Sequence, residues 1–132
     1  MPKDPNLMKG LVFYLEIYCN GKQTDEYFKN NIMELGGRIT PRLGSHVTHM
    51  IWSDGKPKTL LRVSQQYTHI NIVSTLWFTK CFEEMRLADE ANFLPPRYNQ
   101  ILTKALEADL KSTARGLKKT QNKTMVAKTG LP

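Results

Sequence analysis

The stretch INIVSTLWFTKCFEEM, residues 70–85, combines a short apolar run with a segment in which a tryptophan precedes a cysteine by four residues. Its first four residues have the length and the β-branched character of a buried strand. The hydroxyl residues that follow, Ser74 and Thr75, are both suited to cap a helix. Trp77 and Cys81 then lie one turn apart on the same helix face. The stretch therefore predicts a strand and a helix whose apolar face, with Trp77 as its largest side chain, packs into a core.

Upstream of this stretch, strand and helix signals alternate. The run GLVFYLEIY, residues 10–18, is apolar almost throughout, which is typical of a parallel strand covered on both faces. Further strands are predicted within 38–45 and at 46–52, and helices at 24–35, where Gly36-Gly37 ends the helix, and at 59–67. The order β-α-β-β-α-β-α predicts an α/β domain with a four-stranded, mainly parallel sheet flanked by three helices.

Downstream, the sequence changes character. Tyr98, Ile101, Leu102 and Ala105 share one face of a further predicted helix. Residues 111–132 hold six Lys/Arg and no acid, with little periodicity, and are predicted to be flexible. We therefore expect three parts: a domain at 9–96, an additional helix at 97–110 and a basic flexible tail at 111–132.

The positive charge is concentrated after the domain. Residues 1–95 carry 11 Lys/Arg and 10 Asp/Glu, whereas residues 96–132 carry 8 Lys/Arg and 2 Asp/Glu. A basic tail on a near-neutral domain favours an anionic partner, such as nucleic acid, an acidic protein or a localisation receptor; the alternative is a solvated linker in a longer protein. No apolar window approaches the roughly 20 residues of a membrane span, and the N-terminus has no signal-peptide pattern, so we expect a cytosolic or nuclear protein without a membrane partner.

Nothing in the sequence indicates catalysis. A nucleophilic cysteine needs an electropositive, partly exposed setting and a nearby base, and the three histidines show no spacing that pairs them with Cys19 or Cys81. The adjacent acids Asp25-Glu26 and Glu83-Glu84 point their carboxylates in different directions on a helix. Two cysteines cannot form a zinc site unaided. We expect free thiols, no cofactor, no metal and no enzyme activity.

The pattern as a whole resembles the BRCT domain family over roughly residues 9–96. The residues that carry the resemblance are Gly36-Gly37, Thr48, His49, Val73, Ser74, Trp77, Cys81 and the exit segment EANFLPP at 90–96. Within the family, HVTHMIWSDG and IVSTLWFTKC are most similar to the N-terminal BRCT domain of one member. The resemblance implies a non-catalytic protein-interaction module in a nuclear protein of the DNA damage response, DNA repair, the cell cycle or chromosome organisation.

The resemblance also implies a candidate phosphate pocket, because many BRCT domains bind phosphopeptides. By position, the turn after the first strand supplies Cys19, Asn20 and Gly21, and the second helix supplies Thr59 with either Lys58 or Arg62 as the cation. The hydroxyl residue that the family usually has in the turn is replaced by Cys19, a weak donor. The alternative is a solvated turn and a helix start at which Thr59 only caps.

The second functional hypothesis is a BRCT module that binds DNA through its basic extension. The candidate residues are Lys111, Arg115, Lys118, Lys119, Lys123 and Lys128. Because this segment lacks aromatic side chains that stack on bases, only non-specific attraction to the phosphate backbone is expected. The salt dependence of binding distinguishes this hypothesis from a protein partner, phosphorylated or not.

Overall fold

The structure is a computed structural model that describes residues 3–120, with side chains described up to Lys111. The chain forms two compact units, and the boundary between them lies after Tyr98. The elements of the first unit, in chain order, are β1 (Val12–Cys19), β2 (Lys22–Gln23), α1 (Glu26–Glu34), β3 (Arg38–Ile39), β4 (His49–Ser53), α2 (Pro57–Gln66), β5 (Asn71–Val73), α3 (Thr75–Glu84) and the 3₁₀ helix η1 (Glu90–Phe93). This order confirms the predicted alternation of strands and helices.

The five strands form one sheet in the order β2-β1-β4-β5, with β3 also paired to β1. Every pair is parallel except β1 with β2, so the predicted parallel character is confirmed. The sequence predicts four of these strands and does not predict β2. Asn20 (φ 53°) and Gly21 (φ 80°) form a two-residue turn that pairs Cys19 with Lys22. Positive φ at both positions is what a tight hairpin requires, and Asn-Gly accepts it most readily.

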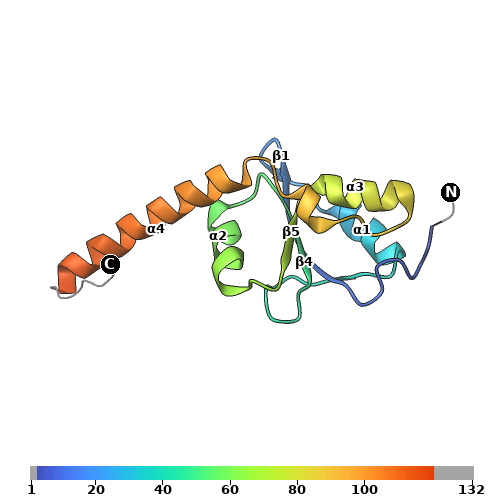
Figure 1. Cartoon of the computed structure of the whole chain (residues 1–132), viewed down its shortest axis with the longest axis horizontal. Coiled ribbons are helices and arrows are strands. Elements are labelled where there is room, and N and C mark those ends of the chain that lie inside the picture. Colours follow the sequence, from blue (N-terminus) through green and yellow to red (C-terminus); the bar gives the residue numbers. More distant parts are fainter. Residues whose placement is uncertain (1–2, 121–132) are drawn as a thin grey trace. The chain divides into compact units, whose positions relative to one another are not determined.

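Helices cover both faces of the sheet. Figure 1 shows α2 on one side of β4 and β5, and α1 and α3 on the other. Alternate β1 residues, Phe13, Leu15 and Ile17, are buried in one core cluster with side chains of α1 and α3, including Trp77. The chain passes close to β1 after α1, since a Cβ on Gly37 would lie 3.2 Å from the Phe13 ring. The sheet therefore holds the start of α3 against β1 and β4.

Helix α4 (Tyr98–Thr120) ends later than predicted. The expected helix end at residue 110 is wrong, because residues 111–120 are helical, while the flexibility predicted for 111–132 stays a prediction. Six of these ten residues are Lys, Arg, Ala or Leu, which favour helix, and the single Gly116 costs only about 1 kcal/mol. Lys123 and Lys128 lie outside the described residues. None of the helices described is both long and apolar enough to cross a membrane.

Candidate functional site

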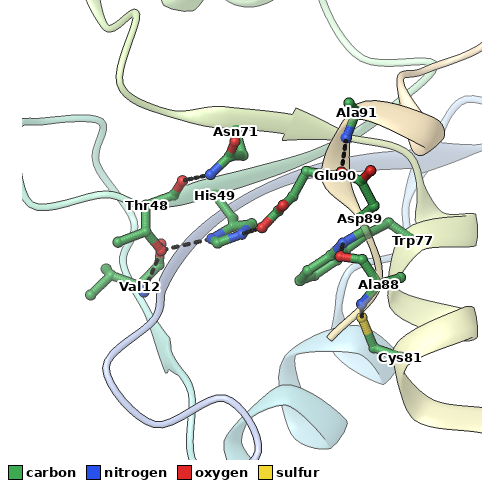
Figure 2. Close-up of polar contacts among 10 residues, drawn as sticks. All are labelled: Val12, Thr48, His49, Asn71, Trp77, Cys81, Ala88, Asp89, Glu90 and Ala91. Carbon is green, nitrogen blue, oxygen red and sulfur yellow. Dashed lines mark hydrogen bonds and ion pairs between the residues drawn. The ribbon is translucent and has the colours of Figure 1, made fainter. Parts of the chain in front are cut away.

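The Trp77 side chain makes its contacts inside the protein. It is fully buried, and its indole Nε1 donates to the Ala88 carbonyl at 2.9 Å (Figure 2). Its ring stacks on that of His49, with centroids 4.9 Å apart. Trp77 thereby links the start of α3 to β4 and to the segment that precedes η1, so it fixes the fold and offers nothing to a ligand.

His49 is the centre of a hydrogen-bonded chain between the sheet and η1. Its ring is buried, with Nε2 2.8 Å from Glu90 Oε2 and Nδ1 2.8 Å from Thr48 Oγ1 (Figure 2). Burial lowers the pKa of His49 below 6.5, although the Glu90 carboxylate opposes this shift. The ring is therefore neutral at pH 7 and carries one N–H. Because a carboxylate only accepts hydrogen bonds, that N–H is on Nε2 and donates to Glu90.

The neutral tautomer of His49 also determines the orientation of the Thr48 hydroxyl. With its proton on Nε2, the ring accepts at Nδ1, and the hydroxyl donates to it instead of to the Val12 carbonyl 3.1 Å away. That carbonyl already accepts the Thr48 N–H at 2.9 Å, so it keeps a partner. The hydroxyl oxygen of Thr48, Oγ1, in turn accepts the Val12 N–H at 2.9 Å. The Thr-His pair thus connects β1, β4 and η1.

The environment of Cys81 is unlike that of a reactive thiol. It is fully buried, and its Sγ accepts the Ala88 N–H at 3.2 Å. Burial raises the pKa of the Cys81 thiol, so the nucleophilic thiolate is disfavoured. Within residues 3–120, no group of three metal-ligating side chains gathers to hold a metal ion.

The candidate phosphate residues come from two segments at the same end of the sheet. The Asn20-Gly21 turn follows the carboxyl end of β1, and α2 follows that of β4, its parallel neighbour. Cys19 is exposed at this turn. The geometry therefore places the turn and the α2 N-terminus at one end of adjacent strands, where parallel strands commonly present ligand sites.

The N-terminus of α2 has few free donors. Pro57 at the first helical position has no N–H, and the Thr59 N–H bonds back to the Lys56 carbonyl at 3.1 Å. Arg62 is directed toward Tyr67, with its guanidinium 5.6 Å from the ring centroid and Nη2 3.4 Å from the hydroxyl. Of the two alternative cations, Lys58 is thus the one whose ammonium has no side-chain partner among the described residues.

A buried carboxylate that the sequence analysis does not predict, that of Glu16, also lies at this helix end. Glu16 is 6% exposed, and its Oε2 accepts the Lys56 N–H at 2.5 Å and the Trp52 Nε1–H at 3.2 Å. A Cβ on Gly55 would lie 2.4 Å from the same oxygen, so the turn closes tightly around it. This negative charge opposes a phosphate dianion. The sequence does contain one signal that could have indicated this buried carboxylate, since Glu16 is the single acid in the apolar run at 10–18.

The candidate DNA-binding residues are only partly described. Lys111 is exposed, and the backbone places Arg115, Lys118 and Lys119 within α4. The four lie on one continuous helix, so a duplex contact can involve them together.

Comparison with known proteins agrees with the architecture. The family model for the BRCA1 C Terminus (BRCT) domain matches residues 3–82. Mouse microcephalin is 33% identical over 89 residues, which cover 65% of this chain and 10% of that protein. Microcephalin is also the member whose N-terminal BRCT domain the two segments quoted above resemble. The chain matches only about a tenth of this relative's length.

Solved structures have the same fold. The first BRCT domain of the DNA-repair protein XRCC1 has a TM-score of 0.51 and 22% identity, covering 68% of this chain and 67% of that one. Rad4 BRCT1,2 in complex with an Mdb1 phosphopeptide has a TM-score of 0.50 and 22% identity, covering 67% and 46%.

Proposed function

The chain belongs to the BRCT family, and from that premise we propose that it is a non-catalytic protein-interaction module of a nuclear protein acting in the DNA damage response or in chromosome organisation. The match of the family model over residues 3–82 carries the proposal. The family's characteristic residues support it, because Trp77, His49 and Cys81 are all engaged in internal contacts. A scaffold fixed in this way leaves its surface for partners.

An affinity purification from nuclear extract tests this function. We expect the full chain to retain a reproducible set of DNA-repair or chromosome proteins, absent from a matched column that carries an unrelated domain. Parallel purifications from phosphatase-treated extract show which partners need phosphate. Recovery of no such protein under either condition contradicts the proposed function.

Recognition of a phosphorylated partner is a second candidate, favoured by one specific arrangement. The Asn20-Gly21 turn and the start of α2, with Lys58 and Thr59, lie at the same end of parallel neighbours β1 and β4. Rad4 BRCT1,2, which shares the fold, is known in complex with a phosphopeptide. The buried Glu16 carboxylate weakens this candidate, because it already accepts the Lys56 N–H.

Glu16 gives the sharpest test of phosphate recognition. Both of its hydrogen bonds go to one oxygen, which the amide oxygen of Gln can replace, so Glu16→Gln removes the charge and keeps the bonds. With an oriented phosphoserine peptide library as probe, Glu16→Gln is expected to strengthen binding, and Lys58→Ala or Thr59→Ala to abolish the preference over unphosphorylated peptides. Arg62→Ala, the other cation choice, serves as the comparison. Equal binding of both peptide forms by all variants excludes this candidate.

A further inference from the structure

A cavity of about 380 Å³ is lined by the last turn of α2, by β5, and by the chain from η1 to Tyr98. It therefore lies at the opposite end of α2 from the candidate phosphate residues Lys58 and Thr59. All of its walls belong to the first unit. Ligand pockets begin at about 300 Å³, so the cavity has room for a side chain of a partner.

The cavity is acidic and has no cation of its own. Asp89 and Glu90, the cap and the first residue of η1, both line it, and none of its lining residues is Lys, Arg or His (Figure 2). The Asp89 carboxylate accepts only uncharged donors, the Ala91 N–H at 3.2 Å and Asn92 Nδ2 at 3.4 Å. Glu90 pairs with His49, whose buried ring is neutral at pH 7. Neither carboxylate is thus neutralised by a cation among the described residues.

Two backbone features add negative potential to the same cavity. Val63 and Ser64 line it from the last turn of α2, and a helix C-terminus carries a partial negative charge. Ile72 lines it from β5, the edge strand of the sheet. Because the Asn71 N–H bonds to Thr48 on the β4 side and strand residues alternate, the Ile72 C=O is directed away from β4. Among the described residues, no backbone donor reaches this carbonyl.

The remaining walls offer apolar contact area. Leu94 is 47% exposed, and Tyr98 is half-buried. Burial raises the pKa of the Tyr98 hydroxyl, so this side chain is uncharged at pH 7. Lys and Arg side chains pack their methylene stems on apolar surfaces while the charged head reaches a polar group. The cavity thus combines the two kinds of surface that such a side chain needs.

We propose that this acidic pocket, formed by Asp89, Glu90, Ile72, Leu94 and Tyr98, binds a lysine or arginine side chain from a basic segment of a partner protein. The cationic head pairs with the two carboxylates and donates to the Ile72 carbonyl, and the stem packs on Leu94 and Tyr98. The same charges repel phosphate groups, so the pocket does not accept nucleic acid or a phosphorylated residue. The inference rests on the proposed interaction function and names the chemistry of one partner.

Conservative substitutions remove the charge of the pocket and keep its internal contacts. Gln in place of Glu90 still offers an oxygen to the His49 Nε2–H, and Asn in place of Asp89 still accepts the Ala91 N–H. The test variant is the double substitution Asp89→Asn/Glu90→Gln. Glu83→Gln, at an exposed position on α3, is the matched control because it removes an acid outside the pocket. Asp89→Asn alone, also at an exposed position, replaces the double variant if that variant does not fold.

A displayed library of random nine-residue peptides is the probe. Peptides that bind the double variant are removed first, and the remainder are selected on the full parent chain. We expect the selected peptides to contain Lys or Arg beside an apolar residue, and the best one to bind the double variant about tenfold more weakly, or Asp89→Asn alone about threefold more weakly. Glu83→Gln should bind it as the parent does. Titration into ¹⁵N-labelled protein should give the largest amide shifts at Ile72, Glu90 and Leu94.

Other outcomes overturn the inference in distinguishable ways. Equal binding by the parent and the charge-removing variants, selected peptides without Lys or Arg, or shifts centred on the Asn20-Gly21 turn each exclude the pocket as the binding site. Self-association of the parent that is lost both in the double variant and on deletion of 111–132 assigns the pocket to the chain's own basic extension instead. If the double variant retains the same nuclear partners as the parent, the pocket proposal fails while the interaction function stands. If the parent retains none, the interaction function fails.

Discussion

The region around Trp77 and the open edge of β1 belong to one sheet but differ in how their polar groups are satisfied. The Trp77 Nε1, both ring nitrogens of His49 and the Cys81 sulfur each have a hydrogen-bond partner. The side chain of Leu15 belongs to the same core cluster. Its backbone N–H and C=O, however, have no partner in β2 or β3. A group whose bonds are all made internally has little to offer a ligand. The residues that are most distinctive in the sequence therefore build the scaffold, whereas the ladder beside Leu15 is incomplete.

The largest effect on stability is expected from removing the Trp77 side chain. Trp77→Ala removes a fully buried ring and leaves the Ala88 carbonyl without its donor, so we expect a loss of roughly 3–5 kcal/mol in the free energy of unfolding. Denaturant titration measures it. Leu76→Ala is the matched control, because this neighbour on α3 is 61% exposed and should change stability by less than about 0.5 kcal/mol. Equal midpoints for the two variants would show that Trp77 is no part of the core.

The next effect is expected at the link to η1. Glu90→Ala leaves the buried Nε2–H of His49 without an acceptor, at a cost of about 1–3 kcal/mol. Glu83→Ala, on the outer face of α3, is the control and should be near neutral. Denaturant titration at pH 7 compares the free energies of unfolding of the two variants. A near-neutral Glu90→Ala would contradict the view that the buried polar groups around Trp77 depend on their internal hydrogen-bond partners.

A smaller effect is expected from pH. The folded pKa of His49 lies below 6.5, so the unfolded chain binds more protons in the interval between that pKa and 6.5. The free energy of unfolding is thus highest above about pH 6.5 and falls as pH decreases through this interval. Burial tends to raise the pKa of Glu90, but the bond from His49 keeps it below 4.5, so its own contribution is lost only at more acidic pH. Denaturant titrations from pH 7.5 downward should show a slope that His49→Gln reduces; an unchanged slope would contradict the assignment.

The weakest effect concerns DNA. The six cations of 111–132 predict a log–log salt slope of up to about −5 and a Kd of about 10⁻⁴–10⁻⁶ M for duplex DNA. Deletion of 111–132 should abolish this binding and leave the first unit folded. Because α4 reaches Thr120, truncation after Thr120 keeps four of the cations and should give a slope of up to about −3.6. Unchanged affinity and slope after deletion from 111 would move the DNA-binding surface from the basic extension to the BRCT body, and would favour a DNA-binding module over a protein-interaction module.

The comparison of regions also explains what the sequence could predict. The strands, the three covering helices and the turn signals follow from local composition and spacing, which act over a few residues. The hairpin strand β2 has two residues, too few for any periodicity. Glu16 bonds residues 36 and 40 positions away, and His49 meets Glu90 41 positions away, so these contacts arise only from the folded chain. The opening at Leu15 likewise depends on where two neighbouring strands stop. The candidate phosphate and DNA-binding residues stay predictions.

Amide hydrogen exchange along β1 in the free protein tests the central contrast most directly. Tyr14 and Glu16 direct their N–H groups to β4, whereas Leu15 and Ile17 direct theirs to the opening. We expect the Leu15 amide to exchange with solvent clearly faster than those of Tyr14 and Glu16. If Leu15 is as protected as its two neighbours in the free protein, the edge is already closed and the contrast between the two regions is wrong.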